Sequence, residues 1–321
     1  MVFSEFQKKY EGRVKHGELL SKHTTLHVGG PAKYYFEAKT REEIIETLAA
    51  AKSDSMRVAI LGGGSNVLFA DSGFDGLVMR PMLSGLRIQE DGSVRAEAGV
   101  LSSILTRKTA EAGLAGFEWA ATLPGTIGGA VRGNAGCFGG EIKDSLSYVE
   151  IVRSGEVITI PQTACQFAYR DSCFKNHNND DVILAASFEL KKSESTSCLA
   201  KVDEIFAKRK ATQPQGVTSA GCMFKNFEYK DENEIEKLKS VKQIPDAFLQ
   251  KKMIPVGWLI EQAELKGYCI GGVCVSEAHG NFLITKPGTT ADHILQLIAA
   301  IKTRVRNQFG IQLQEEVQLM T

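Results

Sequence analysis

Two glycine-rich segments in the first half of this chain constrain its fold more than any other feature. They are residues 61–66, which read LGGGSN, and residues 123–130, which read LPGTIGGA. Gly62, Gly63 and Gly64 follow an apolar run over 58–61 that predicts a buried strand. Residues without a Cβ can bring their amide N–H groups close to an anion. We therefore expect backbone shaped around a phosphate-bearing ligand, and above all a pyrophosphate.

Ordinary turns are the alternative for each segment, because glycines after a strand commonly mark a turn or a close backbone crossing. The first segment lacks the G-x-G-x-x-G spacing of a dinucleotide fingerprint, and it lacks the Lys-Ser/Thr pair of a P-loop. Further glycines at 29–30, 133, 136 and 139–140 favour a long ligand that approaches the backbone at several points.

Charge and composition exclude several classes of protein. The 38 Lys and Arg residues equal the 38 Asp and Glu residues, so the chain has no basic field for nucleic acid or an anionic membrane. The first ten residues lack the apolar core of a signal peptide, and we find no apolar run long enough to span a bilayer, so a cytoplasmic protein is expected. Seven cysteines without a C-x-x-C pair argue against a disulfide framework and a zinc site. Most are expected to be small core residues.

The length of 321 residues predicts two or three domains of mixed helix and strand. Apolar periodicity predicts helices over 41–52, 101–112 and 258–265, and one that begins at the Thr290 cap and continues to 301. Predicted strands cover 58–61, 76–79, 86–88, 93–98, 148–152, 157–160, 182–190, 272–275 and 282–285. The polar stretch 191–197 is a predicted domain boundary.

Three motifs occur in a fixed order and carry a family resemblance. Residues 23–31 (HTTLHVGGP), 62–68 (GGGSNVL) and 124–130 (PGTIGGA) resemble the UDP-N-acetylenolpyruvoylglucosamine reductases, the MurB flavoenzymes. The resemblance continues at 134–136, 139–142, 167–172, 220–224, 257–260, 266–267, 275–276, 278–282 and 316–317. It therefore spans nearly the whole chain.

The resemblance implies an α+β fold with a two-lobed FAD-binding domain of the p-cresol methylhydroxylase (PCMH) type and a C-terminal α+β substrate domain. The implied lobes are residues 1–85 and 86–195, followed by the substrate domain at 196–321. Only a short segment, 171–181, precedes the next predicted strand, so the chain resembles the branch without the tyrosine-bearing substrate loop. The implied protein is a monomer.

The implied activity is an NADPH-dependent reduction, through FAD, of UDP-N-acetylglucosamine enolpyruvate to UDP-N-acetylmuramate in peptidoglycan precursor biosynthesis. Hydride addition to an alkene beside a carboxylate builds negative charge as an enediolate, and the neighbouring carbon must then be protonated. Such a site needs a cation and a proton donor.

Three residues match the catalytic positions of the family. Arg170 matches the arginine beside the developing charge, although an arginine next to Asp171 is more commonly a surface ion pair. Glu316 matches the glutamate near the reacting carbon, with Glu315 as an exposed neighbour. Cys222 stands where many members have a donor serine, and a thiol with a pKa of about 8.5 can deliver a proton. Ser219 is the competing donor, and an inert buried cysteine is the other alternative.

The cofactor and substrate contacts follow from the same match. The residues expected to bind FAD are Gly62, Gly63, Gly64, Ser65, Asn66, Thr126, Gly128 and Gly129. Lys225 and Asn226 are expected to meet the substrate diphosphate. Two other functions compete: an oxidase of alcohols or sugars that returns electrons to oxygen, and a non-catalytic flavin or nucleotide sensor.

Overall fold

The computed structural model describes residues 1–175 and 180–321, and these divide into two compact units. Unit 1 consists of residues 1–18, 32–64 and 74–211. Unit 2 consists of residues 19–31, 65–73 and 212–321. The chain therefore passes repeatedly between the two units.

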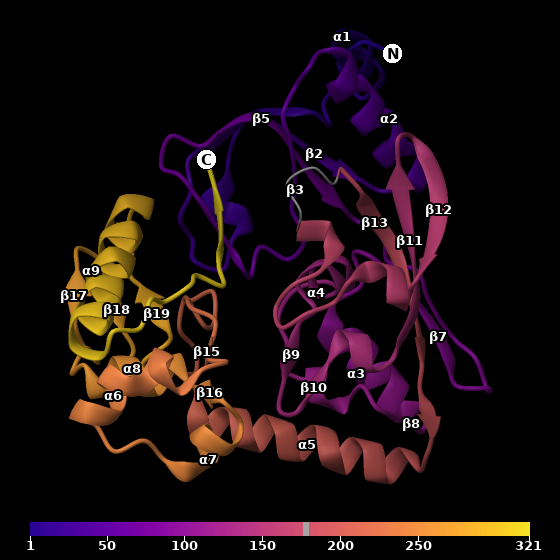
Figure 1. Ribbon diagram of the computed structural model, residues 1–321. Helices are drawn as coiled ribbons and strands as arrows, with labels where there is room; N and C mark the ends of the chain where they lie inside the picture. Colours follow the sequence, from indigo (N-terminus) through magenta and orange to yellow (C-terminus); the bar gives the residue numbers. More distant parts are fainter. Residues whose placement is uncertain (176–179) are drawn as a thin grey trace. The chain divides into compact units, whose positions relative to one another are not determined.

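A four-stranded sheet in the order β1-β2-β5-β3 forms one part of unit 1 (Figure 1). Its strands are β1 (Lys15–Leu19), β2 (Pro31–Ala38), β3 (Val58–Ile60) and β5 (Phe74–Pro81). Both β2 and β3 pair in parallel with β5, whose residues Leu77, Val78 and Met79 are fully buried. The predicted strands over 58–61 and 76–79 are confirmed.

A five-stranded sheet in the order β12-β11-β13-β7-β6 forms the other part of unit 1. Its strands are β6 (Leu86–Ile88), β7 (Ser93–Glu97), β11 (Leu146–Arg153), β12 (Glu156–Pro161) and β13 (Val182–Glu189). All residues of β13 except its last are buried, because its continuous apolar run lies in the middle of the sheet with both faces covered. The predicted strands in this region are therefore confirmed.

The helices of unit 1 are α1 (Phe3–Lys9), α2 (Arg41–Ser53), α3 (Ser102–Glu111), α4 (Ile127–Gly133) and α5 (Ser195–Thr212, which ends at the border of unit 2). The short strands are β8 (Leu114–Ala115), β9 (Gly136–Cys137), β10 (Gly140–Glu141) and β14 (Lys191–Lys192). The α2 helix begins as its sequence predicts, because the Thr40 hydroxyl accepts a hydrogen bond from the Glu43 N–H at 3.2 Å.

The polar stretch 191–197, which is predicted as a domain boundary, has regular secondary structure. It contains β14, which pairs with β8, and the start of α5. The periodicity of α5 escapes sequence analysis because only Cys198, Val202 and Ile205 are buried along its length. The three-part division at 85 and 195 stays a prediction about function, and the compact units divide the chain differently.

Unit 2 packs its helices and short strands around a core of its own. The helices are α6 (Glu236–Val241), α7 (Asp246–Gln250), α8 (Val256–Gln262) and α9 (Ala291–Phe309). The strands are β4 (Val67–Phe69), β15 (Phe227–Glu228), β16 (Met253–Ile254), β17 (Cys269–Ile270), β18 (Val273–Val275), β19 (Leu283–Thr285) and β20 (Gln318–Met320). The α8 helix begins two residues before the predicted start and ends three before the predicted end.

The α9 helix lies beside β17 and β18 and covers the core of unit 2 (Figure 1). It begins where the sequence predicts, since the Thr290 hydroxyl accepts from the His293 N–H at 3.1 Å. It continues to Gly310, whose φ of +76° suits a residue without a Cβ. Ile294, Leu297 and Ile301 are completely buried, as their spacing on one helical face requires.

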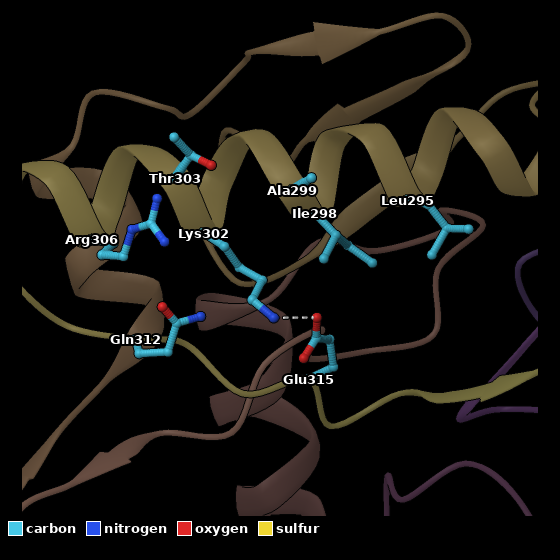
Figure 2. A pocket seen from close by; sticks show the side chains of 8 residues that line it. All are labelled: Leu295, Ile298, Ala299, Lys302, Thr303, Arg306, Gln312 and Glu315. Carbon is cyan, nitrogen blue, oxygen red and sulfur yellow. Dashed lines mark hydrogen bonds and ion pairs between the residues drawn. The ribbon is translucent and has the colours of Figure 1, made fainter.

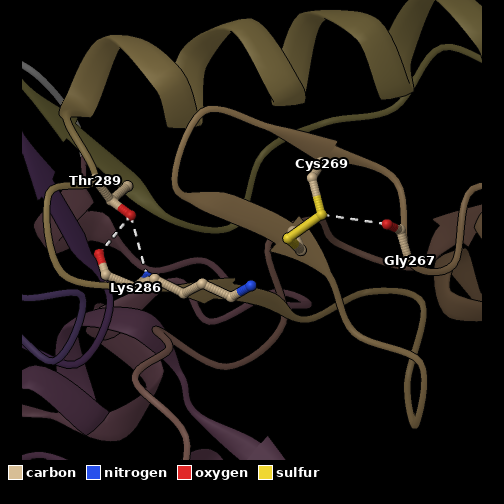
Figure 3. The surroundings of a disulfide bond; sticks show 5 residues. Gly267, Cys269, Lys286 and Thr289 are labelled. Atoms are coloured by element: carbon tan, nitrogen blue, oxygen red, sulfur yellow. Dashed lines mark hydrogen bonds between the residues drawn. A yellow bond between two sulfur atoms is a disulfide. The ribbon is translucent and has the colours of Figure 1, made fainter.

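A disulfide between Cys269 and Cys274 corrects the expectation drawn from the cysteine count. The two residues are direct partners across the antiparallel pair β17–β18, so the hairpin brings their sulfur atoms together (Figure 3). Spacing alone does not reveal this, because the pairing depends on a two-residue turn. Cys165 and Cys198 are buried thiols, as expected, and burial raises the pKa of Cys165 to about 12.

Two further observations concern the sequence predictions. The short segment taken as evidence against a tyrosine loop lies partly at 176–179, outside the described residues, so that prediction stays a prediction. Within residues 1–175 and 180–321, no helix has the length and apolar character needed to cross a membrane.

Candidate active site

The two glycine-rich segments lie in contact inside unit 1. A Cβ added at Gly63 would lie 2.6 Å from the Cα of Gly125, and one added at Gly62 would lie 2.7 Å from the Thr126 Oγ1. Gly64 has a φ of +65°, a backbone conformation that residues with a Cβ rarely adopt. The contact therefore requires glycines and brings together segments that lie 60 residues apart.

Several polar groups around this contact are available to a ligand. The α4 helix follows Thr126. The Ile127 N–H donates to the Val100 carbonyl at 2.8 Å, and the Gly128 N–H donates to the Ala98 carbonyl at 2.9 Å. Among the described residues, the N–H groups of Gly62, Gly63 and Gly129 have no hydrogen-bond partner. The Gly129 nitrogen lies 4.0 Å from the Cβ position of Gly62.

Thr126 adds a hydroxyl to this cluster of amides. The residue is only 6% exposed, and its side chain makes no capping bond to α4. Neighbouring unbonded amide N–H groups and a hydroxyl are the donors that bind a diphosphate. Gly128 is glycine for a packing reason, since a Cβ there would lie 2.9 Å from the Cβ of Ala98. These observations fit a nucleotide cofactor at the Gly62–Gly129 contact.

Ser65 and Asn66 belong to unit 2, although they follow the glycines directly. The Asn66 side-chain amide donates to the carbonyl of Glu316 at 3.2 Å, and the Asn66 carbonyl accepts from the Gln318 N–H at 3.0 Å. This pairing continues into the parallel strands β4 and β20. The cofactor contact of Asn66 stays a prediction, and the structure shows that Asn66 holds the segment of Glu316.

Arg170 stands on a tight turn in unit 1. Ala168 and Asp171 exchange two backbone hydrogen bonds, both of 3.1 Å, and Arg170 between them has a φ of +54°. Its guanidinium donates to the carbonyl of Gly136 and lies over the ring of Tyr169. A left-handed backbone at a residue other than glycine is a strained arrangement, and such arrangements gather at functional sites.

A buried asparagine supports this turn. Asn134 ends α4 in the left-handed conformation, and its side-chain amide donates to the carbonyl of Ala168 at 2.9 Å. Its side-chain oxygen accepts from the Lys143 N–H at 3.1 Å. Asn134 therefore ties the helix of the second glycine segment to the turn of Arg170. The motif at 134–136 was noticed in the sequence, but the role of Asn134 was not.

Cys222 and Glu316 are brought onto neighbouring backbone segments of unit 2. Cys222 is a bridge partner of Phe282, and Phe224 is a bridge partner of Glu315. The Glu316 N–H donates to the carbonyl of Met223 at 2.8 Å. Cys222 is partly exposed and lies outside the disulfide. Residues 222–224 therefore pair both with the segment that precedes β19 and with the segment that precedes β20.

Glu315 has a structural role beside α9. Its carboxylate pairs with Lys302 at 2.7 Å, at the edge of a hollow of about 310 Å³ (Figure 2). The expectation of an exposed charge is replaced by a partly buried ion pair, with Glu315 and Lys302 side chains 25% and 27% exposed.

The two predicted substrate residues follow Phe224. The Lys225 N–H donates to the carbonyl of Gln314 at 2.9 Å. The Asn226 side-chain oxygen accepts from the Val256 N–H at 3.2 Å, where α8 begins. Asn226 therefore helps to cap α8. A contact between Asn226 and the substrate would have to leave this hydrogen bond in place. Ser219, the competing donor, accepts from the Gly221 N–H at 3.2 Å.

Comparisons with known proteins agree with this architecture. The FAD binding domain family matches residues 32–160, and the UDP-N-acetylenolpyruvoylglucosamine reductase C-terminal domain family matches residues 213–320. The chain is thus an FAD-dependent oxidoreductase, and the α+β fold class expected from the sequence is confirmed.

Full-length relatives narrow the class to one family. The chain is 35% identical over 303 residues to the UDP-N-acetylenolpyruvoylglucosamine reductase of Lactobacillus delbrueckii subsp. bulgaricus, which covers 94% of this chain and 93% of that protein. It is 33% identical over 318 residues to that of Carboxydothermus hydrogenoformans, covering 98% and 97%. The crystal structure of the MurB enzyme from Thermus caldophilus matches with a TM-score of 0.75 and 30% identity, covering 96% and 99%. The chain belongs to the UDP-N-acetylenolpyruvoylglucosamine reductase family.

Proposed function

We propose that this chain reduces UDP-N-acetylglucosamine enolpyruvate to UDP-N-acetylmuramate with Arg170, Cys222 and Glu316 as its catalytic residues. One observation carries the assignment of roles. The chain positions Cys222 and Glu316 on hydrogen-bonded neighbouring segments, although 94 residues separate them in the sequence. A shared chemical task is a direct reason to hold a thiol and a carboxylate on adjacent segments.

The contact between the two glycine segments would hold FAD. Gly62, Gly63 and Gly129 offer amide N–H groups, and Thr126 offers a hydroxyl. Gly64, Ser65, Asn66 and Gly128 complete the expected set of cofactor residues. When bound there, FAD would supply the hydride for the alkene carbon of the substrate, with NADPH as the source of that hydride.

Arg170 stabilises the charge that develops on the substrate. Hydride addition converts the carboxylate and the neighbouring carbon into an enediolate, which carries an additional negative charge. The guanidinium neutralises that charge without losing its own proton. The turn between Ala168 and Asp171 fixes the Arg170 backbone, so little ordering is needed when the substrate binds.

Cys222 then donates the proton to the carbon next to the carboxylate. The enediolate collapses to a carboxylate as the new C–H bond forms, and the thiolate recovers a proton from solvent. Glu316, held by Met223 and Asn66, orients the donor or the carbon that receives the proton. Lys225 and Asn226 are proposed to meet the substrate diphosphate.

The remaining proposals concern the protein as a whole. We infer a cytoplasmic monomer that takes a UDP-sugar and NADPH and binds no nucleic acid. This inference is supported by the balanced charge. We also propose that residues 1–85 and 86–195 act as the FAD-binding lobes and that residues 196–321 act as the substrate domain. The chain is further proposed to belong to the branch of the family without a tyrosine-bearing substrate loop.

An anaerobic two-step experiment tests the function. The purified protein is reduced with NADPH while the visible flavin band is followed, and UDP-N-acetylglucosamine enolpyruvate is then added without oxygen. We expect prompt return of the band and formation of UDP-N-acetylmuramate. Return of colour only with oxygen would identify an oxidase instead. A flavin that NADPH does not bleach would identify a sensor.

A further inference from the structure

Asn281 makes three hydrogen bonds to the segment that follows Cys222. The side chain is 1% exposed and makes two hydrogen bonds to Phe224. Its oxygen accepts from the Phe224 N–H at 3.0 Å, and its nitrogen donates to the Phe224 carbonyl at 2.8 Å. The Asn281 carbonyl also accepts from the Met223 N–H at 2.8 Å. One residue thus satisfies three backbone groups immediately after the thiol.

The segment that Asn281 holds is also joined to Glu316. The Met223 carbonyl accepts from the Glu316 N–H at 2.8 Å. Asn281 therefore fixes the backbone from which both Cys222 and Glu316 take their positions. A shift of the Phe224 peptide would move both residues.

The backbone of Asn281 is itself held in place. The Asn281 N–H donates to the Nδ1 of His279 at 3.2 Å. The ring of His279 packs onto Gly257, where an added Cβ would lie 3.0 Å from the ring carbon Cε1. The ring also contacts the ring of Phe282. These contacts give the side chain of Asn281 a fixed base.

The chemistry of the contact restricts what can replace asparagine. An amide side chain offers a donor and an acceptor at the same depth, and Phe224 needs both. A carboxylate of the same shape offers only acceptors, so it would face the Phe224 carbonyl without a proton between them. An apolar residue would leave both backbone groups buried without partners.

We propose that Asn281 is a positioning residue that fixes the Cys222 segment for proton donation. The proposal rests on the proposed role of Cys222 and adds a requirement for Asn281 that the family assignment does not contain. Asn281 does not act on the substrate. It acts through the Phe224 peptide on the geometry of its neighbours.

Two variants test the proposal. Asn281→Asp keeps the shape of the side chain and removes the donor to Phe224, whereas Asn281→Ala removes both bonds. Thr285→Val is the matched control, because the buried Thr285 hydroxyl in β19 donates to the Leu26 carbonyl at 2.9 Å and to the Thr218 carbonyl at 3.4 Å, and not to residues 222–224. All three are compared as FAD-bound proteins with the wild type.

Two measurements are made on each protein. The first follows alkylation of Cys222 by iodoacetamide, quantified on the Cys222 peptide by mass spectrometry. The second follows the NADPH and substrate half-reactions separately under anaerobic conditions. We expect both Asn281 variants to raise the alkylation rate about tenfold and to slow the substrate half-reaction about tenfold. The NADPH half-reaction and both rates of Thr285→Val should stay at wild-type values.

The two variants also separate positioning from general destabilisation. If the Asn281 variants lower the melting temperature as Thr285→Val does, but leave Cys222 alkylation and the substrate half-reaction unchanged, the proposal is overturned. If Asn281→Ala does not fold, the isosteric Asn281→Asp carries the test. Should Cys222→Ala retain the substrate half-reaction while the Asn281 variants still raise alkylation, the donor role is wrong but the positioning contact stands.

Discussion

The turn of Arg170 in unit 1 and the segment of Cys222 in unit 2 are held in different ways. Arg170 is fixed by a strained turn, with a φ of +54°, and by partners that lie 34 residues away in the sequence. The Cys222 segment is extended and takes its partner Asn281 from 57 residues away, while Asn66 reaches Glu316 across 250 residues. The turn of Arg170 is held by contacts between nearer segments, and the Cys222 segment depends on more distant ones.

This difference agrees with the roles that we propose for the two segments. A guanidinium stabilises a developing charge by lying close to it, without precise alignment. The tight turn of Arg170 holds this side chain in place, although its backbone is strained. A proton donor must be aligned with one carbon, and alignment requires a rigid neighbourhood. The structure accordingly surrounds the Cys222 segment with hydrogen bonds from two sides.

The largest effect is expected from the donor itself. Cys222→Ala should slow the substrate half-reaction by about 10²-fold or more, because proton transfer by a positioned group contributes about 10²- to 10⁴-fold. Cys222→Ser should keep much of the activity, since a hydroxyl still donates. Anaerobic stopped-flow measurement of each half-reaction checks this. Equal slowing of both half-reactions by Cys222→Ala would contradict the proposed donor role of Cys222.

Substitutions of Arg170 should separate strain from charge. Arg170→Ala and Arg170→Gly both lose the guanidinium, and each should lower the rate of the substrate half-reaction by about 10²- to 10³-fold. Glycine accepts the left-handed backbone, so Arg170→Gly should be more stable than Arg170→Ala by about 1 kcal/mol. Urea unfolding measures the difference. Equal stability would mean that the turn stores no strain.

The contact between the glycine segments should fail when a methyl group is added. Gly63→Ala places a carbon 2.6 Å from the Gly125 Cα and should cost about 1 to 3 kcal/mol of stability and lower the bound FAD. Gly133→Ala is the matched control, because nothing lies within 4 Å of that Cβ position at the end of α4. The ratio of flavin to protein absorbance gives the FAD content. A full FAD complement in Gly63→Ala would contradict the proposed site.

The smallest effects concern acid stability, and the two units should respond in different pH windows. In unit 2, burial lowers the pKa of His279 below 6.5. As the pH falls, His279 therefore binds a proton in the unfolded chain at a higher pH than in the folded protein. Its contribution to the free energy of unfolding is fully present above pH 6.5 and declines as the pH falls toward the folded pKa. The non-titrating variant His279→Asn should flatten this decline in denaturant melts between pH 5 and 7.

In unit 1, the corresponding group is Glu150. Hydrogen bonds from Arg95, and then from Arg41, lower the pKa of Glu150 below 4.5. Its contribution is complete above pH 4.5 and is lost as the pH falls through the folded pKa. Glu150→Gln should therefore lower the free energy of unfolding at pH 7 and make it depend less on pH below pH 4.5. Urea unfolding at a series of pH values measures both effects. If the substitution instead changes the pH dependence near pH 6, Glu150 is not the group that titrates in the acid window.

Local patterns predicted most of the regular structure. The helices α2 and α3, the hairpin β11–β12 and the buried strand β13 lie where periodicity placed them, because each pattern is contained in one short stretch. The start of α9 was readable for the same reason, since Thr290 is a local cap. By contrast, α5 was missed because few of its residues are buried.

Long-range pairing was not readable from the sequence. The Cys269–Cys274 disulfide depends on strand register, and the pairing of β4 with β20 joins residues that are 251 positions apart, such as Val67 and Gln318. The roles of Asn281 and Asn134 also stayed hidden, because an asparagine in a loop motif has the same local appearance whether it is solvated or buried.

The sequence by itself determined the family and the cofactor class, and it predicted Arg170, Cys222 and Glu316 as catalytic residues, because ordered motifs and residue chemistry need no coordinates. Only the tertiary structure decided that Gly62 and Gly63 pack on Gly125 and Thr126, and that Asn66 supports Glu316. It alone also placed Asn281 against Phe224. The physical reason is that hydrogen bonds and close packing depend on distance in space, which a linear pattern does not record.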